Sequence, residues 1–214
     1  NIIKVLVASA TRKLLENKGE NYMKKVILGT GMIEQIMNIT RDFVAKDNAR
    51  PLLKNIKLDV YKNKIEATAI DGYKLAILEL NYQNENQEEF SCYIKPFKLP
   101  KGIITTEISV DEKNTYITLN LNNNSAITYT NISDVGEFLN VKKILPELNE
   151  EFSISFNANY LAKMVNSVKD FNGNVKMYFS FEDGKIKKMA PMRIETDLKD
   201  TGHITSILLP VKTF

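Results

Sequence analysis

Few residues in this chain have the types and spacing that catalysis requires. The chain has one histidine, His203, and one cysteine, Cys92. One histidine is too few for a metal cluster or a nucleophilic triad, and it is typical of a surface or hydrogen-bonded core residue. The acidic pairs are adjacent residues in predicted loops, where neighbouring side chains point apart: Glu88-Glu89, Asp111-Glu112 and Glu150-Glu151. The sequence therefore predicts neither an enzyme active site nor a bound metal or cofactor.

The segment Gly29-Thr30-Gly31 is the one glycine pair that suggests phosphate binding. It lacks the Lys-Ser/Thr of a P-loop and the third glycine of a dinucleotide fingerprint. We interpret it as a turn between a strand and a helix.

Composition indicates a globular protein of one or two domains in a reducing compartment. The chain has 214 residues, 43% of them hydrophobic, and its single cysteine cannot form an internal disulfide. No apolar run approaches the roughly 18 to 20 residues that span a bilayer, so we expect no membrane segment. A cytoplasmic location fits these features best.

Residues 1–22 do not belong to the pattern that follows them. Lys18-Gly19-Glu20 can be encoded by codons that contain a bacterial ribosome-binding sequence, at a suitable distance before Met23. We therefore expect 1–22 to be a non-native leader. It holds four of the basic and two of the acidic side chains, so without it the formal net charge falls from +3 to +1. A nearly neutral chain argues neither for nor against a nucleic-acid partner.

The stretch from Arg50 to Leu80 organises the rest of the chain. Apolar and polar residues alternate over 56–60 and again over 65–69, with a turn at 62–64, which predicts a hairpin with one buried face. Asp71-Gly72 then forms a tight turn, because glycine accepts a positive φ, and 73–80 supplies a third strand.

Similar strand groups lie on either side of this stretch. A strand over 24–28 and an amphipathic helix from Met32 to about residue 47 precede it, which completes one βαβββ unit. A second unit has strands at 90–94, 106–110, 115–121 and 126–132, but Pro96 and Pro100 exclude a helix between its first two strands. A third unit has a strand over 152–156, a helix capped by Asn157, and strands over 175–181, 185–191, 192–196 and 204–210.

Four segments carry a resemblance to a known family. Arg50-Pro51-Leu52-Leu53 and Ala67-Thr68-Ala69-Ile70-Asp71-Gly72-Tyr73-Lys74-Leu75-Ala76 resemble the middle domain of the bacterial DNA sliding clamp, the beta subunit of DNA polymerase III. Tyr73 stands where that family usually has His, and Lys74 where it has Arg. Gly136–Pro146 resembles the connector between the second and third clamp domains, and Ile207–Lys212 resembles the clamp C-terminus.

The resemblance implies an α+β, sheet-rich, clamp-like fold. Its repeated βαβββ units would form antiparallel sheets with amphipathic helices on one face. We expect a clamp-like domain over 23–134, a connector over 135–150 and a partial clamp-like domain over 151–214. A full clamp subunit has six such units and this chain has three, so the resemblance is to a shortened homologue.

The same resemblance implies a hydrophobic groove that takes the linear peptide motif of polymerases and clamp loaders. The residues at matching positions are Leu53, Ile70, Gly72, Tyr73, Lys74, Leu75, Leu139, Lys143, Ile144, Leu209, Pro210, Val211 and Lys212. Apolar walls would hold the apolar anchors of an extended peptide, with the two lysines at the rim. The alternative is that these residues close the core between two domains.

The resemblance also implies contact with double-stranded DNA through basic residues on the helices, without base recognition. The candidates are Arg41, Lys46, Arg50, Lys163 and Lys169; acidic residues on the same helices leave a solvated surface as an equal alternative. The overall expectation is a non-catalytic processivity factor for DNA replication, with a possible homo-oligomeric ring. The alternative is a regulator that binds clamp partners, or the host clamp, without encircling DNA.

Overall fold

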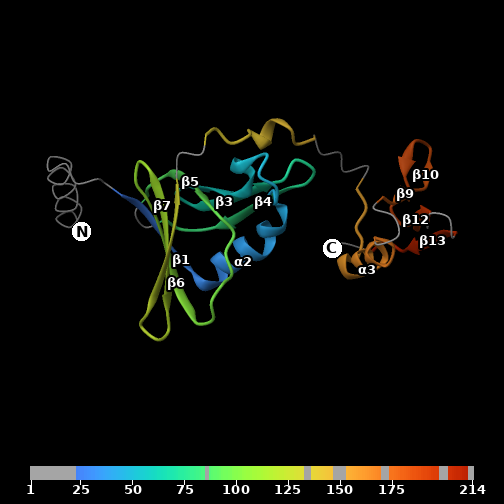
Figure 1. Cartoon of the computed structure of the whole chain (residues 1–214). Helices are drawn as coiled ribbons and strands as arrows, with labels where there is room; N and C mark the ends of the chain where they lie inside the picture. The colour runs from blue at the N-terminus through green and yellow to red at the C-terminus, as the bar shows by residue number, and fades with distance from the viewer. Residues whose placement is uncertain are drawn as a thin grey trace, which may run out of the picture. The chain divides into compact units, whose positions relative to one another are not determined.

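The computed structural model describes residues 23–84, 87–132, 136–146, 153–169, 174–197 and 202–211. The chain divides into two compact units, unit 1 up to Asn140 and unit 2 from Val141 onward, and each is described here by itself (Figure 1). The predicted leader over 1–22, the boundary near 134 and Lys212 lie outside the described residues. Within the described residues, no helix combines the length and the apolar character that a membrane crossing requires.

The first half of unit 1 is a βαβββ unit, as the sequence predicts, but its helix ends at Thr40 and not near residue 47. Its helix α2 buries Ile33, Ile36, Met37 and Thr40, which recur at the three- and four-residue spacing of one helix face. Two short 3-10 turns, η1 and η2, lead from the helix to the meander. The elements are β1 (Lys24–Gly29), α2 (Thr30–Thr40), η1 (Arg41–Phe43), η2 (Pro51–Lys54), β2 (Ile56–Val60), β3 (Lys64–Ile70) and β4 (Leu75–Asn81).

The second half of unit 1 keeps the strands but has no helix between the first two. Residues 95–102 have no helical residue, which confirms the expectation from Pro96 and Pro100. Phe97 and Leu99 from this segment pack against the core, and the ring of Phe97 stacks on Tyr129 at 4.8 Å between centroids. The strands are β5 (Phe90–Ile94), β6 (Ile103–Val110), β7 (Asn114–Leu121) and β8 (Ala126–Ile132).

The two halves of unit 1 exchange their opening strands. One antiparallel sheet has the order β1-β6-β7-β8 and the other β4-β3-β2-β5, so each three-stranded meander is completed by the first strand of the other half. Helix α2 contacts strands of both sheets. The core between them is built from aliphatic side chains of both halves, and Leu28, Ile36, Leu58, Ile94 and Ile108 are all fully buried in it.

Unit 2 is smaller and contains one such half. Its helix α3 (Ala158–Val168) begins at the predicted cap, where the Asn157 side chain accepts hydrogen bonds from the backbone N–H groups of Asn159 and Tyr160. The sheet has the order β13-β12-β9, and a short hairpin stands beside it. The strands are β9 (Lys176–Tyr178), β10 (Phe181–Glu182), β11 (Lys185–Ile186), β12 (Met192–Asp197) and β13 (His203–Leu208).

Three strand expectations for unit 2 are wrong. The strand expected over 175–181 is interrupted at residues 179–180, and β9 and β10 belong to different sheets. The strand expected over 152–156 is absent from residues 153–156, where the carbonyl of Ser155 accepts a hydrogen bond from the N–H of Val211. The strand expected over 185–191 ends at Ile186, since the chain turns again at residues 188–190 before β12.

Candidate peptide-binding groove

The turn between β3 and β4 is held by the side chain of Asp71. One carboxylate oxygen of Asp71 accepts hydrogen bonds from the backbone N–H groups of Tyr73 at 2.9 Å and Lys74 at 3.0 Å. The backbone hydrogen bond from Tyr73 is the largest cause that lowers the pKa of Asp71, and the bond from Lys74 adds to it. The carboxylate therefore stays ionised and fixes the backbone on which the predicted groove residues sit.

Gly72 and Arg50 meet at this turn. Gly72 has φ +98°, a conformation that other residues adopt at a cost, and a Cβ added there would lie 2.1 Å from Nη1 of Arg50. The sequence predicts Arg50 as a DNA-facing residue, and contact with DNA stays a prediction; its side chain is exposed with its guanidinium against the Gly72 turn. The signal for this was present, since Arg50 opens the Arg-Pro-Leu-Leu segment that carries the resemblance.

The remaining groove residues of unit 1 differ in exposure, and Lys74 lies beside the turn. Tyr73 is 94% exposed, whereas Ile70 is buried and Leu53 and Leu75 are half-buried. The Lys74 ammonium lies 3.6 Å from the Asp71 carboxylate and 5.5 Å from the centre of the Phe43 ring. Phe43 is thus a neighbour of Lys74 that the sequence does not single out.

Five other predicted groove residues are exposed and Pro210 is half-buried; the exposed residues are Leu139, Lys143, Ile144, Leu209 and Val211. Leu139 lies in the last residues of unit 1, while Lys143 and Ile144 follow at the start of unit 2. Leu209 is 66% exposed and Val211 is exposed as well, directly after β13. The groove takes residues from both units, so it stays a prediction. Exposed apolar side chains occur in each part, and in the first part Tyr73 sits on the turn that Asp71 fixes.

The predicted DNA-facing residues are all exposed. Arg41 lies in η1 and Lys46 follows it, and Lys163 and Lys169 lie on and just after α3. Asp42 and Asp47 are exposed beside the first pair. Acidic side chains thus lie among the basic ones, and DNA contact stays a prediction.

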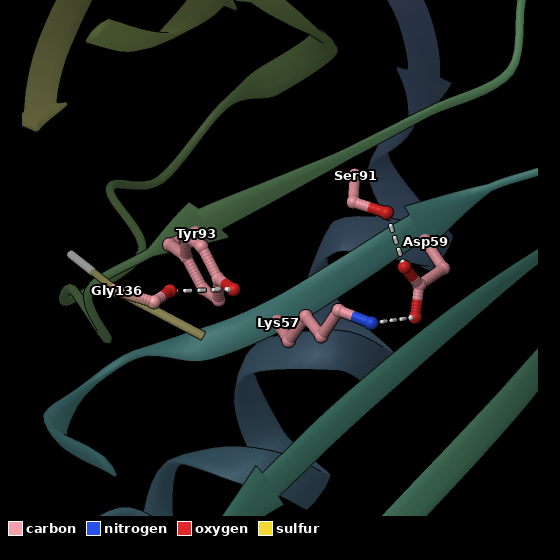
Figure 2. Close-up of polar contacts among 5 residues, drawn as sticks. All are labelled: Lys57, Asp59, Ser91, Tyr93 and Gly136. Atoms are coloured by element: carbon pink, nitrogen blue, oxygen red, sulfur yellow. Dashed lines mark hydrogen bonds and ion pairs between the residues drawn. The ribbon is translucent and has the colours of Figure 1, made fainter. Parts of the chain in front are cut away.

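A polar cluster on the outer side of β2 and β5 is the arrangement in unit 1 that most resembles an active site (Figure 2). The Lys57 ammonium lies 2.9 Å from the Asp59 carboxylate, and the hydroxyl of Ser91 donates to the other carboxylate oxygen. Burial lowers the pKa of Lys57, but the hydrogen bond and charge of Asp59 outweigh this and raise it. A lysine held protonated cannot act as the base for Ser91, so this cluster is a structural ion pair within β2 that is joined to β5 by the Ser91 hydrogen bond.

Other polar groups that could do chemistry are already paired or buried. His203 Nδ1 lies 2.9 Å from Asp197, and this hydrogen bond lowers the pKa of the carboxyl. The pair lines a shallow open pocket of unit 2 together with Asn174, Lys176, Glu195 and Thr196. Burial raises the pKa of Cys92 to about 12, so its thiol is unreactive in the folded protein. The described residues contain no group of three or more side chains able to hold a metal ion.

Comparison with known proteins finds solved structures that have a similar architecture. No protein-family model and no curated protein sequence matches the chain. Among solved structures, it is similar to the DNA polymerase III beta chain of Streptococcus pneumoniae, with a TM-score of 0.70, 16% identity, and coverage of 88% of this chain and 50% of that one.

Two further sliding clamps give the same picture. The Bacillus subtilis clamp matches with a TM-score of 0.72 and 13% identity, over 90% of this chain and 50% of that one. The Thermotoga maritima beta subunit matches with a TM-score of 0.65 and 19% identity, over 90% and 51%. The chain therefore spans about half the length of these structures. The resemblance seen in the sequence is confirmed, and this chain has the fold of the bacterial DNA sliding clamp, the beta subunit of DNA polymerase III.

Proposed function

We propose that the protein is a non-catalytic, sliding-clamp-like factor of bacterial DNA replication that binds polymerase or repair proteins through a hydrophobic peptide groove. One observation carries this proposal. The places where the resemblance puts the groove hold exposed apolar side chains, namely Tyr73 beside the Asp71 turn and Leu209 and Val211 after β13. Exposed apolar residues next to fixed backbone are typical of a binding surface.

The chemistry of this surface suits an extended peptide. Leu75, Leu209 and Val211 offer apolar contacts to two or three hydrophobic side chains of such a peptide. Lys74, held by Asp71 at 3.6 Å, supplies a positive charge for a polar or acidic residue of the ligand. Because Asp71 fixes the turn in advance, little conformational entropy is lost there on binding.

Fluorescence polarisation with a labelled peptide carrying the clamp-binding motif of a bacterial polymerase tests the groove. Leu75→Asp combined with Leu209→Asp places two carboxylates against the apolar anchors and should weaken binding at least tenfold, because burying an unpaired polar group costs about 1–3 kcal/mol. The matched control is Ile104→Asp with Ile127→Asp, two exposed apolar residues of β6 and β8, which should bind normally.

Two outcomes count against the groove. Unchanged peptide affinity in the Leu75 and Leu209 variant would mean that the peptide binds elsewhere. Loss of circular dichroism in that variant, but not in the control, would mean that these residues close a core.

DNA binding is the second part of the proposal. Arg41, Lys46, Lys163 and Lys169 would contact phosphates of double-stranded DNA without reading bases, in a cytoplasmic protein that encircles DNA as a homo-oligomer. Retention on nicked circular DNA, with release when the circle is linearised, is the expected result. Retention on linear DNA that is just as long-lived would contradict encirclement.

A second candidate function is a regulator that binds clamp partners, or a host clamp, without encircling DNA. The observation that favours it is the helix-free segment over 95–102, because unit 1 then offers one helix face instead of two for DNA contact. Peptide binding without any DNA retention would select this function.

A further inference from the structure

Phe138 is the buried side chain among the connector residues that belong to unit 1, 136–140. It is 7% exposed, whereas the residue that follows it, Leu139, is 51% exposed. Gly136, Glu137 and Asn140 are exposed as well. An aromatic side chain that is buried in an otherwise exposed segment attaches that segment to the fold, because its large apolar area is removed from water there.

The ring of Phe138 lies against Tyr93 of β5. The two ring centroids are 6.0 Å apart with an interplanar angle of 34°, within the range of favourable aromatic pairs. The Tyr93 hydroxyl also donates to the carbonyl of Gly136 at 3.5 Å, the long limit of a hydrogen bond, as Figure 2 shows. One tyrosine thus contacts the connector at two of its residues.

Tyr93 is itself fixed by the sheet. It lies opposite Lys57 of β2, and its carbonyl accepts a hydrogen bond from the side-chain amide of Asn131 at 3.2 Å. Its neighbours in β5, Cys92 and Ile94, are buried in the core of unit 1. Side chains alternate along a strand, so the Tyr93 ring lies on the opposite, outer face of the sheet. The connector is therefore attached to a rigid strand surface.

This attachment lies outside the core of unit 1. The core cluster contains side chains of both halves, and among the described residues neither Phe138 nor Tyr93 belongs to it. The outer face that carries Tyr93 also carries the polar cluster of Lys57, Asp59 and Ser91. Phe138 therefore determines the position of its own segment more than it stabilises the fold.

The attached residue is next to a predicted groove residue. Leu139 is the groove residue of the connector that belongs to unit 1, and one peptide bond separates it from Phe138. A free connector would lose conformational entropy when a bound peptide orders it. An attached connector has lost that entropy on folding, so more of the contact with Leu139 is available as affinity.

We propose that Phe138 is a positioning residue of the peptide site, an inference that rests on the function proposed above. Its packing on Tyr93 holds the connector on unit 1. Leu139 is thereby presented to an apolar side chain of the peptide. Phe138 acts through Leu139 and not by its own contact with the peptide.

A double-mutant cycle tests this role, with the labelled clamp-motif peptide and fluorescence polarisation. Leu139→Ala should weaken binding about tenfold through lost apolar contact. Phe138→Ala should weaken it about three- to tenfold, the range for ordering one side chain. The double variant should bind as Leu139→Ala does, because a positioning residue has no effect once the residue that it positions is removed. Phe138→Leu, which keeps an apolar side chain on Tyr93, should restore most of the affinity.

Phe97→Ala is the matched control for loss of stability. Phe97 is likewise a large aromatic residue of unit 1 that packs on a tyrosine, with 4.8 Å between its centroid and that of Tyr129, and it also contacts the core. Its loss should lower the melting temperature at least as much as Phe138→Ala and leave the peptide affinity unchanged. If Phe138→Ala does not fold, Tyr93→Val removes the other side of the same contact and takes its place in the cycle, since valine suits a strand.

Three results overturn the positioning role in a protein that binds the peptide. Normal affinity in Phe138→Ala would mean that the connector needs no attachment. Normal affinity in Leu139→Ala would mean that the connector is not part of the site. Fully additive losses in the double variant would mean that Phe138 acts without Leu139. A protein that binds no peptide at all would instead overturn the proposed function, and this inference with it.

Discussion

Replacing Gly72 by alanine should destabilise unit 1, because Gly72 lies in the β3–β4 turn in a backbone conformation that is strained for alanine. Gly72 has φ +98°, where a Cβ is strained, and the added Cβ would lie 2.1 Å from Nη1 of Arg50. The guanidinium is the far end of a flexible side chain, so it can move aside at small cost. Backbone strain at residue 72 should therefore account for most of the lost stability.

The expected cost of Gly72→Ala is about 1–2 kcal/mol in the free energy of unfolding, the value for a non-glycine residue forced into left-handed backbone. Gly31→Ala is the matched control, since Gly31 lies in the first turn of α2 and a Cβ there would meet nothing within 4 Å. Alanine at that position should be neutral or stabilise by up to about 1 kcal/mol. The double variant Gly72→Ala with Arg50→Ala removes the steric contact with the guanidinium and keeps the backbone strain, so it shows which of the two causes the loss of stability.

Cys92 supplies the assay. It is the single cysteine, it is buried in β5 of unit 1, and burial raises the pKa of its thiol to about 12. Alkylation therefore requires opening of unit 1 and follows the equilibrium population of the open state when opening is fast. A cost of 1–2 kcal/mol should speed alkylation about 5- to 30-fold in Gly72→Ala.

Two outcomes would refute this reasoning. An unchanged alkylation rate in Gly72→Ala would mean that the turn tolerates a Cβ. Recovery of the normal rate in the double variant with Arg50→Ala would mean that steric contact, and not backbone strain, sets the cost.

Two further predictions concern the same unit. The pKa of Asp71 is lowered by folding, so its stabilisation is present above the unfolded value of about 3.8 and is lost as pH falls through the lower folded pKa. The melting temperature of Asp71→Asn should lie below that of the unchanged protein at pH 6, and the difference should vanish near pH 2; a difference that persists in acid would contradict this. Leu58→Ala, at a fully buried core position, should cost about 2–5 kcal/mol in urea unfolding, whereas the exposed control Ile104→Ala should cost under about 1 kcal/mol.

Local patterns predicted most of unit 1 correctly. Alternation over 56–60 and 65–69 marks strands whose one face is buried, and the observed strands β2 and β3 cover those residues. Pro96 and Pro100 correctly excluded a helix, because proline cannot donate the hydrogen bond that a helix interior needs. In each case the residue's own geometry decides the structure.

Contacts between segments that are distant in the sequence could not be predicted from local patterns. Nothing local indicates that β1 pairs with β6 and β5 with β2, since ladder partners are chosen by burial of the whole unit. The pattern over 152–156 is suitable for a strand, but residues 153–156 form none, and the carbonyl of Ser155 accepts a hydrogen bond from the N–H of Val211 in the segment that follows β13. The position of Arg50 against Gly72 likewise depends on how η2 packs beside the β3–β4 turn.

The second half of unit 1 explains how a clamp-like domain keeps its sheets without its second helix. In the first half, α2 fills the core with Ile33, Ile36 and Met37. In the second half, Phe97 and Leu99 pack against that core from an extended segment, and Phe97 stacks on Tyr129. A few large side chains thus fill the space that an apolar helix face would fill. The exchanged strands still complete both sheets around the shared core. The described residues of the second half therefore present no helix surface, whereas the first half presents the exposed face of α2.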